Sequence, residues 1–259
     1  MLLSFRKKKK GLVLFAAAMA ILGCNRKQEV FQIGEFFPEN DRFWEVIPRD
    51  AVVERIGIAF EFTEGPAWHP GGFLIFSDIP GNTIYRWTGK KYIPFRQPSN
   101  HTNGILAEPN GSLVLCEHES RRIARYTIEG DTIVLADKYR DRRLNSPNDL
   151  CKSANGAIYF TDPPWGLPKV NDDPAKELPF NGVFRVFNGN VTVLDSTLSW
   201  PNGIALSPDE GYLYVANMEV LRVNGVDEYQ VHWMSRERWW RKPFFIQPWT
   251  RPFLAGLTE

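Results

Sequence analysis

A repeat in the sequence limits the fold of this chain more than any other feature. Each copy begins with Glu or Asn, enters a short apolar run, turns through Gly, Pro or Asn, and continues into a second apolar run. Gly and Asn accept the positive φ that tight hairpin turns require. Each copy therefore predicts a β-hairpin. The four copies are EGPAWHPGGFLIFSD (64–78), NGILAEPNGSLVLCE (103–117), NDLCKSANGAIYFTD (148–162) and NGIALSPDEGYLYVAN (202–217).

The segments between the copies carry the same strand signal. TIYRWTGKKYIPF (83–95), RIARYTIEGDTIVLA (122–136) and GVFRVFNGNVTVL (182–194) each hold two short β runs around a Gly turn. A hairpin and its following segment make four antiparallel strands in about 40 to 50 residues, the period of a propeller blade. No helical periodicity with caps interrupts them. The sequence predicts an all-β fold, a closed β-propeller in preference to a sandwich.

Propeller geometry gives the first residue of each copy a common position. The innermost strand of a blade lines the central channel, so residues at the same point of successive repeats lie on a ring around it. One carboxylate and three amides would supply the hard oxygen ligands that suit Ca²⁺ or Mg²⁺ better than Zn²⁺. The alternative is that each Asn before Gly or Asp only forms a turn. These ring residues are Glu64, Asn103, Asn148 and Asn202.

The N-terminus predicts export. Five basic residues at 6–10 precede the apolar run GLVLFAAAMAILG, which ends at Cys24. A basic segment followed by an apolar segment too short to span a bilayer is typical of a secretory signal, here residues 1–23. ILGC resembles a bacterial lipobox, which predicts lipidation of Cys24 and a membrane anchor. The alternatives are an ordinary signal peptide or a short anchor with an incidental cysteine.

The residues after Cys24 refine the expected location. Asn25 is not the aspartate associated with inner-membrane retention in some bacteria, so we expect a lipid-anchored protein of the cell envelope, on the outer membrane facing the periplasm. Residues 24–50 are mixed and polar and predict a tether. The net charge of +1 gives no reason to expect nucleic acid as a partner.

Several motifs resemble one enzyme family. EGPAW (64–68), NSPNDL (145–150), YFTDPPWG (159–166) and PNGIALSPDEGYLYVAN (201–217) are similar, in this order, to the senescence-marker-protein, gluconolactonase and luciferin-regenerating-enzyme family. The resemblance runs from about Phe60 to Asn217. It implies a six-bladed β-propeller with a divalent metal, commonly Ca²⁺, in the channel. It also implies hydrolysis of a small-molecule sugar lactone, such as gluconolactone, or of another ester.

The resemblance also implies residue roles. Glu64 and Asn202 match metal ligands of the family, with Mg²⁺ or Zn²⁺ as alternatives to Ca²⁺. Asn148 matches an asparagine that lies at the metal or contacts substrate. Asn103, His118 and Asp162 match positions near the substrate. A metal would polarise the lactone carbonyl and lower the pKa of a bound water, while a carboxylate takes the proton of the water.

A serine hydrolase is the alternative chemistry suggested by His69, Ser77 and His101. The chain contains no Gly-x-Ser-x-Gly segment, which normally presents a nucleophilic serine on a sharp turn. The sequence therefore favours metal-assisted hydrolysis.

The chain departs from the family pattern after Asn217. The family carries a later PDG segment whose aspartate completes the metal site and serves as general base, and this sequence has none. Residues 221–259 show no blade rhythm, so we expect a partial propeller over residues 51–220, about three and a half blades, followed by a divergent tail. A truncated or frame-shifted reading frame is favoured over a tail that closes the fold. The alternatives to an enzyme are a non-catalytic sugar- or partner-binding propeller and an inactive fragment.

Overall fold

The computed structural model describes residues 31–32, 34–38, 40–57, 59–223, 226–235 and 241–246, with side chains up to Met218. The chain divides into two compact units, Met1–Ile56 and Gly57–Glu259. The predicted signal peptide and Cys24 lie outside the described residues, so lipidation stays a prediction. In the part of the chain that the structure describes, no helix combines the length and the apolar character needed to cross a membrane.

The first unit holds more local structure than a tether predicts. Strand β1 (Phe31–Gln32) pairs with β2 (Glu54–Arg55), and a 3-10 helix, η1 (Asp41–Glu45), lies between them. The Asn40 side chain accepts a hydrogen bond from the backbone N–H of Arg42 at 3.0 Å and so begins this helix as an N-cap.

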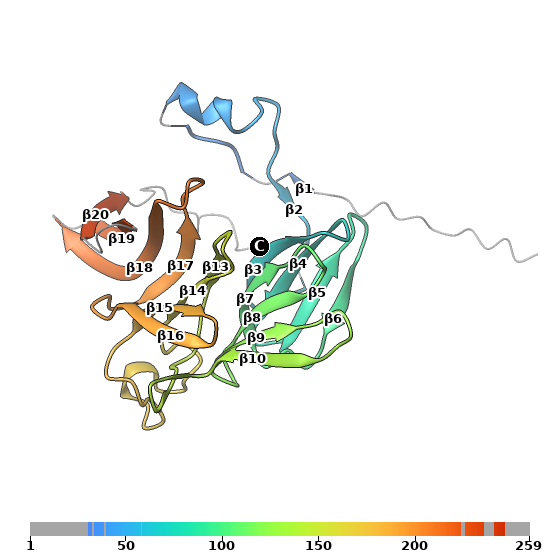
Figure 1. Ribbon diagram of the computed structural model, residues 1–259. Helices are drawn as coiled ribbons and strands as arrows, with labels where there is room; N and C mark the ends of the chain where they lie inside the picture. Colours follow the sequence, from blue (N-terminus) through green and yellow to red (C-terminus); the bar gives the residue numbers. More distant parts are fainter. Residues whose placement is uncertain are drawn as a thin grey trace, which may run out of the picture. The chain divides into compact units, whose positions relative to one another are not determined.

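The second unit consists mainly of four antiparallel four-stranded sheets, each in chain order, which we name blades 1 to 4 (Figure 1). A two-stranded hairpin, β11 (Lys138–Tyr139) and β12 (Arg142–Arg143), follows blade 2, and η2 (Val170–Asp172) lies inside blade 3. The blades comprise β3 (Thr63–His69), β4 (Phe73–Asp78), β5 (Thr83–Trp87) and β6 (Tyr92–Arg96); β7 (Thr102–Ala107), β8 (Leu113–Glu117), β9 (Arg122–Tyr126) and β10 (Thr132–Ala136); β13 (Leu150–Lys152), β14 (Ile158–Asp162), β15 (Gly182–Phe187) and β16 (Asn190–Asp195); and β17 (Pro201–Leu206), β18 (Tyr212–Val223), β19 (Val226–Ser235) and β20 (Arg241–Ile246).

The first strands of successive blades contact one another. β7 contacts β3 on one side and β13 on the other, and β17 contacts β13 and β14. First strands that meet in this order face a common axis, as in a propeller. The prediction of an all-β propeller is therefore confirmed, and each repeat of the sequence forms the first two strands of a blade.

Blade 4 is more complete than the sequence indicated. We expected only its beginning, but β19 pairs with β18 and β20 pairs with β19. The missed signal is the alternation of Tyr229, Val231 and Trp233 with polar neighbours, which has the two-residue period of a strand. The many Trp and Arg residues of this segment made the alternation hard to recognise. Residues 226–235 and 241–246 of the predicted tail therefore belong to a blade.

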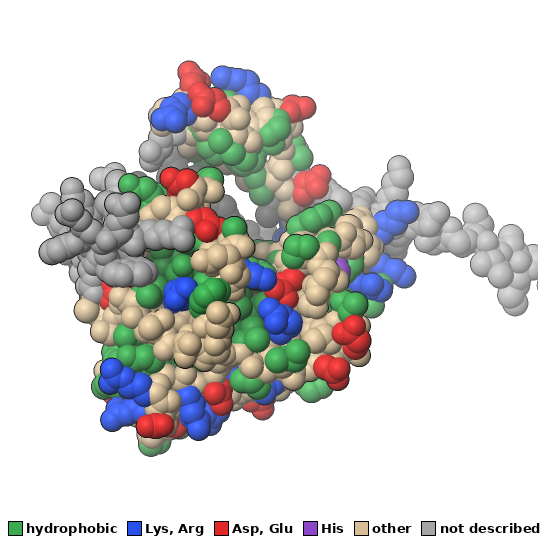
Figure 2. Space-filling view, viewed as in Figure 1, with side chains coloured by type: hydrophobic (Ala, Val, Ile, Leu, Met, Phe, Trp, Pro, Cys, Tyr) green, Lys and Arg blue, Asp and Glu red, His purple; other side chains and the backbone are tan. Residues whose placement is uncertain are grey.

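The core lies between the blades. One apolar cluster joins blades 1 and 2, a second joins blades 2 and 3, and a third joins blades 3 and 4. In the second cluster, Phe160 of β14 stacks on Phe184 of β15 with ring centroids 5.4 Å apart, and both side chains are fully buried. Second strands therefore read as nearly continuous apolar runs, because both of their faces are covered. On the face shown in Figure 2, Lys and Arg side chains alternate with Asp and Glu.

Candidate functional site

The ring residues lie where the first strands are irregular. The pairing register shifts between Glu64 and Ala67 in blade 1, between Thr102 and Ile105 in blade 2, and between Pro201 and Ile204 in blade 4. A bulge at the same point of three blades turns the adjacent side chains out of the regular alternation. Ring residues Glu64, Asn103 and Asn202 lie at or within these bulges, and Asn148 lies just before β13.

Hydrogen bonds between blades bring the ring residues together. The Ser77 hydroxyl of blade 1 donates to the carbonyl of Asn103 at 2.8 Å, and the Thr161 hydroxyl of blade 3 donates to the carbonyl of Asn202 at 2.6 Å. Between blades 2 and 3, the backbone N–H of Gly104 donates to the carbonyl of Asn148 at 2.8 Å. Each blade therefore fixes the ring residue of the next.

Glycines permit this close approach. Gly65 has φ of +56°, and a Cβ atom there would overlap the carbonyl oxygen of Asn103. A Cβ atom on Gly104 would lie 2.7 Å from the carbonyl oxygen of Asn148. The glycine after a ring residue is thus needed at these two positions so that one backbone can meet the next.

The side chains of the ring suit a hard cation. Asn103 and Asn148 are only 5% and 4% exposed, yet their amides form no hydrogen bond with the described residues. The amide atoms of both side chains keep some solvent-accessible surface, so a ligand can reach them. Among the described residues, the half-buried Glu64 carboxylate accepts a hydrogen bond only from the N–H of Gly65, at 3.4 Å. One carboxylate with amide oxygens is a ligand set for Ca²⁺.

The described part of the chain contains no cluster of His, Cys, Asp and Glu that would suit a softer metal such as Zn²⁺. No three His, Cys, Asp or Glu side chains within it gather closely enough to hold a metal ion. Zn²⁺ prefers nitrogen and sulfur ligands, whereas the ring offers oxygens. The residues present therefore fit Ca²⁺ or Mg²⁺ better than Zn²⁺.

Asp149 is a carboxylate beside the ring that the sequence reading missed. Its Oδ1 accepts the N–H of Leu150 at 2.8 Å, and its Oδ2 accepts the N–H of Ile204 at 3.1 Å, which ties blade 3 to blade 4. Burial raises the pKa of Asp149, and the negative charge of Glu64 raises it further. A signal was present: the second residue of the other three copies is glycine, and only the third copy has an acid there.

Asp162 lies behind the ring. It is fully buried, and its Oδ2 accepts the N–H of Asn145 at 2.7 Å, in the segment that leads to Asn148. Asp78 of blade 1 and Asn217 of blade 4 accept the N–H groups of Phe62 and Trp200 in the same way. Asp162 is therefore a positioning residue in this fold, and a direct contact with substrate stays a prediction.

His118 lies over the loop that precedes Asn148. Burial lowers its pKa to about 4, helped by the nearby His101, so the imidazole is neutral at neutral pH. The ring is 6% exposed, and Nε2 has no partner among the described residues. A Cβ atom on Gly166 would lie 2.7 Å from the Cβ of His118 and 2.9 Å from that of Ser146, so these segments are in close contact.

The residues of a serine mechanism are not assembled. The Ser77 hydroxyl is buried and bonded to Asn103, whereas His69 lies at the opposite end of β3. The His69 ring stacks on Phe73, and its Nε2 lies 3.1 Å from the carbonyl oxygen of Gly111. His101 Nδ1 lies 2.8 Å from a backbone carbonyl oxygen. This geometry supports the choice of metal-assisted chemistry over a serine nucleophile.

Asp162 and His118 should have opposite effects on how the free energy of unfolding changes with pH. Burial raises the pKa of Asp162 from 3.8 to about 7, so this carboxyl stabilises the fold more as pH falls through that window. Burial lowers the pKa of His118 from 6.5 to about 4, so this imidazole stabilises the fold less as pH falls from 6.5 to 4. In the unaltered chain the two contributions oppose each other.

Asp162→Asn should therefore make the protein more sensitive to acid. Without the opposing contribution of Asp162, the free energy of unfolding should fall more steeply on acidification than in the unaltered chain, by at most about 1.4 kcal/mol per pH unit, the free energy of one proton. Urea unfolding at several pH values between those two pKa limits measures the slope. Parallel slopes for the variant and the unaltered chain would contradict the prediction.

Fold and site together define a β-propeller protein whose blades carry oxygen-bearing side chains at a common point of their first strands. The model of the SMP-30/gluconolactonase/LRE-like region matches residues 62–232, and the chain belongs to that family. The match extends beyond Asn217, where the resemblance in the sequence was expected to end. It includes most of β19, in agreement with the pairing of that strand in blade 4.

Individual relatives agree with the family. The chain is 37% identical over 205 residues to a gluconolactonase of Zymomonas mobilis, covering 73% of this chain and 57% of the relative. A solved gluconolactonase of Xanthomonas campestris matches with a TM-score of 0.62 and 32% identity, covering 75% of this chain and 63% of the other. A calcium-binding regucalcin of Agrobacterium tumefaciens, 16% identical, shares the fold with a TM-score of 0.51 over 73% of this chain and 59% of the other. The chain thus spans roughly three fifths of the length of these relatives.

Proposed function

We propose that this protein opens sugar lactones by metal-assisted hydrolysis in the channel between its blades. The observation that carries the proposal is that the buried amides of Asn103 and Asn148 have no hydrogen-bond partner among the described residues, at the same point of the repeat as the carboxylate of Glu64. Unpaired polar groups at a buried site are costly unless a ligand or water pairs them. The relationship to gluconolactonases supports a lactone as the substrate.

Glu64, Asn148 and Asn202 would hold the cation, which we propose to be Ca²⁺. When bound, a divalent cation supplies Lewis-acid polarisation of the lactone carbonyl and lowers the pKa of a water. Asn103, adjacent to the ligands, would orient the hydroxyls of the lactone. His118 would contact the substrate at the loop before Asn148, and because its Nε2 is buried and has no partner among the described residues, this contact requires the groups that cover it to shift.

Asp149 would accept the proton released by the attacking water. Its pKa is raised by burial and by the charge of Glu64, which brings the carboxylate closer to the working pH of a general base. The two N–H groups from Leu150 and Ile204 fix its orientation without protonating it. This assignment gives the ring a base within the described residues, in place of the aspartate of the PDG segment.

Acid release from gluconolactone, followed in a pH-stat, tests the proposal. We expect hydrolysis above the spontaneous rate with Ca²⁺ present, loss of this activity with a chelator, and its return when Ca²⁺ is restored. Mg²⁺ and Zn²⁺ added in separate assays identify the preferred metal. A folded protein that gluconolactone protects from thermal unfolding without any turnover would instead establish a non-catalytic sugar-binding propeller. Absence of both turnover and protection would contradict both functions.

A further inference from the structure

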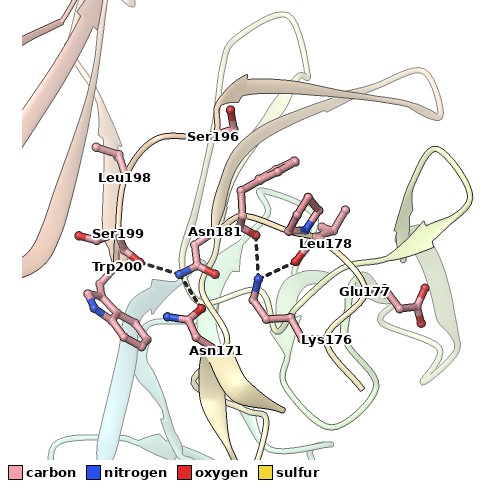
Figure 3. Close-up of a pocket in the computed structure, with 11 residues that line it drawn as sticks. Asn171, Lys176, Glu177, Leu178, Asn181, Ser196, Leu198, Ser199 and Trp200 are labelled. Carbon is pink, nitrogen blue, oxygen red and sulfur yellow. Dashed lines mark hydrogen bonds between the residues drawn. The ribbon is translucent and has the colours of Figure 1, made fainter. Parts of the chain in front are cut away.

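A second polar cavity lies between blades 3 and 4, beside the channel. It has a volume of about 650 Å³, in the range of small-molecule sites. Its walls are the connection from β14 to β15, which contains η2, and the connection from β16 to β17 (Figure 3). These connections leave the same ends of the blades at which Asn148 and Asn202 lie.

Two contacts join this cavity to the ring. Asn181 in its wall lies 3.5 Å from the side-chain amide of Asn145, which begins the segment leading to Asn148. Trp200 in the opposite wall comes two residues before Asn202.

Trp200 supplies the aromatic surface in the wall of the cavity, and Trp165, which is not a lining residue, packs against its ring. The ring of Trp200 stacks on that of Trp165 with centroids 4.5 Å apart and an interplanar angle of 27°. Trp165 is 44% exposed, so the pair extends an apolar surface toward solvent. A pyranose ring presents a face of C–H bonds that packs on such a surface, and its hydroxyls remain at the rim for polar groups.

Fixed polar groups lie at the edge of this surface. Asn181 is 6% exposed and donates to the carbonyl of Ser199 at 2.6 Å and to Oδ1 of Asn171 at 3.1 Å. Figure 3 shows the amide of Asn171 beside the ring of Trp200. The bond from Asn181 orients Asn171 so that its NH₂ group stays available as a donor. A pre-oriented donor binds a hydroxyl at a lower entropic cost.

The two charged side chains of the cavity keep their charges but are engaged by neutral backbone groups. Lys176 Nζ donates to the carbonyls of Leu178 at 2.6 Å and Phe180 at 3.3 Å. The carboxylate of Glu177 accepts the backbone N–H of Arg143 at 2.7 Å and points away from the cavity (Figure 3). Amides, hydroxyls and carbonyls remain, a set that favours a neutral polyol over a phosphate or a carboxylate.

We propose that this cavity binds a neutral hexose unit, so that the preferred substrate is an aldonolactone with a glycosyl substituent. The lactone ring would lie in the channel and the glycosyl ring against Trp200, which Trp165 supports by stacking, with Asn171 donating to one of its hydroxyls. The substrate assignment rests on the proposed lactonase function, whereas the binding of a hexose by the cavity does not.

Two measurements test the inference separately from the lactonase activity. The first is calorimetric titration with lactose, which cannot be hydrolysed as a lactone. We expect saturable binding that weakens at least about tenfold in Trp165→Ala and in Asn171→Ala. Trp68→Ala is the matched control, because Trp68 is an exposed tryptophan of blade 1, and it should bind as the unaltered chain does. Absence of lactose binding, or equal weakening by the control, overturns the proposal even if gluconolactone is hydrolysed.

The second measurement compares kcat/KM for lactobionolactone, a galactosyl gluconolactone, with that for gluconolactone. The glycosylated lactone should be preferred at least about tenfold, and Asn171→Ala should remove this preference while leaving gluconolactone hydrolysis unchanged. Equal kcat/KM values for the two lactones overturn the substrate assignment. If neither lactone is hydrolysed, the lactonase proposal fails, and the lactose titration still decides whether the cavity binds a hexose.

Discussion

Glu64→Gln is expected to abolish both Ca²⁺ binding in the channel and lactone hydrolysis. Glutamine keeps the shape of the side chain but removes the one negative charge among the four ring residues. A ligand that binds only the folded state at a hundred times its Kd stabilises it by about 2.7 kcal/mol. The rise in Tm that Ca²⁺ produces in the unaltered chain should therefore disappear in the variant. Turnover of gluconolactone should fall at least about a hundredfold, as expected when an electrostatic stabiliser is lost.

Glu61→Gln is the matched control for Glu64→Gln. Glu61 is an exposed residue just before β3, so the control removes the same charge close by without touching the ring. It should keep the Ca²⁺-dependent rise in Tm and the activity. A Glu64→Gln variant that still shows that rise would place the cation elsewhere and contradict the assignment of the ring.

Gly65→Ala is expected to destabilise the second unit more than any other single added methyl group at the ring. The residue has φ of +56°, a conformation that costs a residue with a Cβ about 1–2 kcal/mol. The new methyl group would also overlap the backbone carbonyl of Asn103, and overpacking typically adds about 1–3 kcal/mol. Denaturant unfolding should therefore show a loss of about 2–5 kcal/mol. Ca²⁺ binding should weaken as well, because Glu64 moves relative to Asn103.

Gly72→Ala separates the two causes of this loss. Gly72 has φ of +81° in the first hairpin turn, and nothing lies within 4 Å of the position of its Cβ. This variant should show only the conformational cost, about 1–2 kcal/mol, and keep its affinity for Ca²⁺. Equal destabilisation by the two variants would mean that the close approach of blades 1 and 2 at the ring does not matter.

The candidate site shows which kind of inference the sequence supported. Glu64, Asn103, Asn148 and Asn202 were predicted as one set because they share a phase of the repeat, and the structure links their backbones from blade to blade. Asp149 was overlooked because an acid after an asparagine reads locally as a turn. Its approach to Glu64 depends on two strands from different blades.

Asp162 has a structural role that the sequence did not suggest. Its place in a motif of the family suggested a contact with substrate, but its side chain is fully buried and holds the N–H of Asn145. Only a comparison of the blades in space reveals that Asp78 and Asn217 do the same. The sequence indicated that Asp162 belongs to a family motif, but it did not predict the orientation or the burial of its side chain.

The sequence by itself determined most strands, their hairpins, the all-β class and the shared phase from which four oxygen-bearing side chains are predicted to lie on one ring. These properties follow from the two-residue period of a strand and from turn chemistry, which act between neighbours along the chain. Only the tertiary structure decided the pairing of β19 and β20 within blade 4, the bond from Ile204 that holds Asp149 between blades, the burial of Asp162 and the Trp165–Trp200 pair. These features depend on packing between blades, where residues distant in sequence meet at van der Waals contact, and local pattern carries no record of those distances.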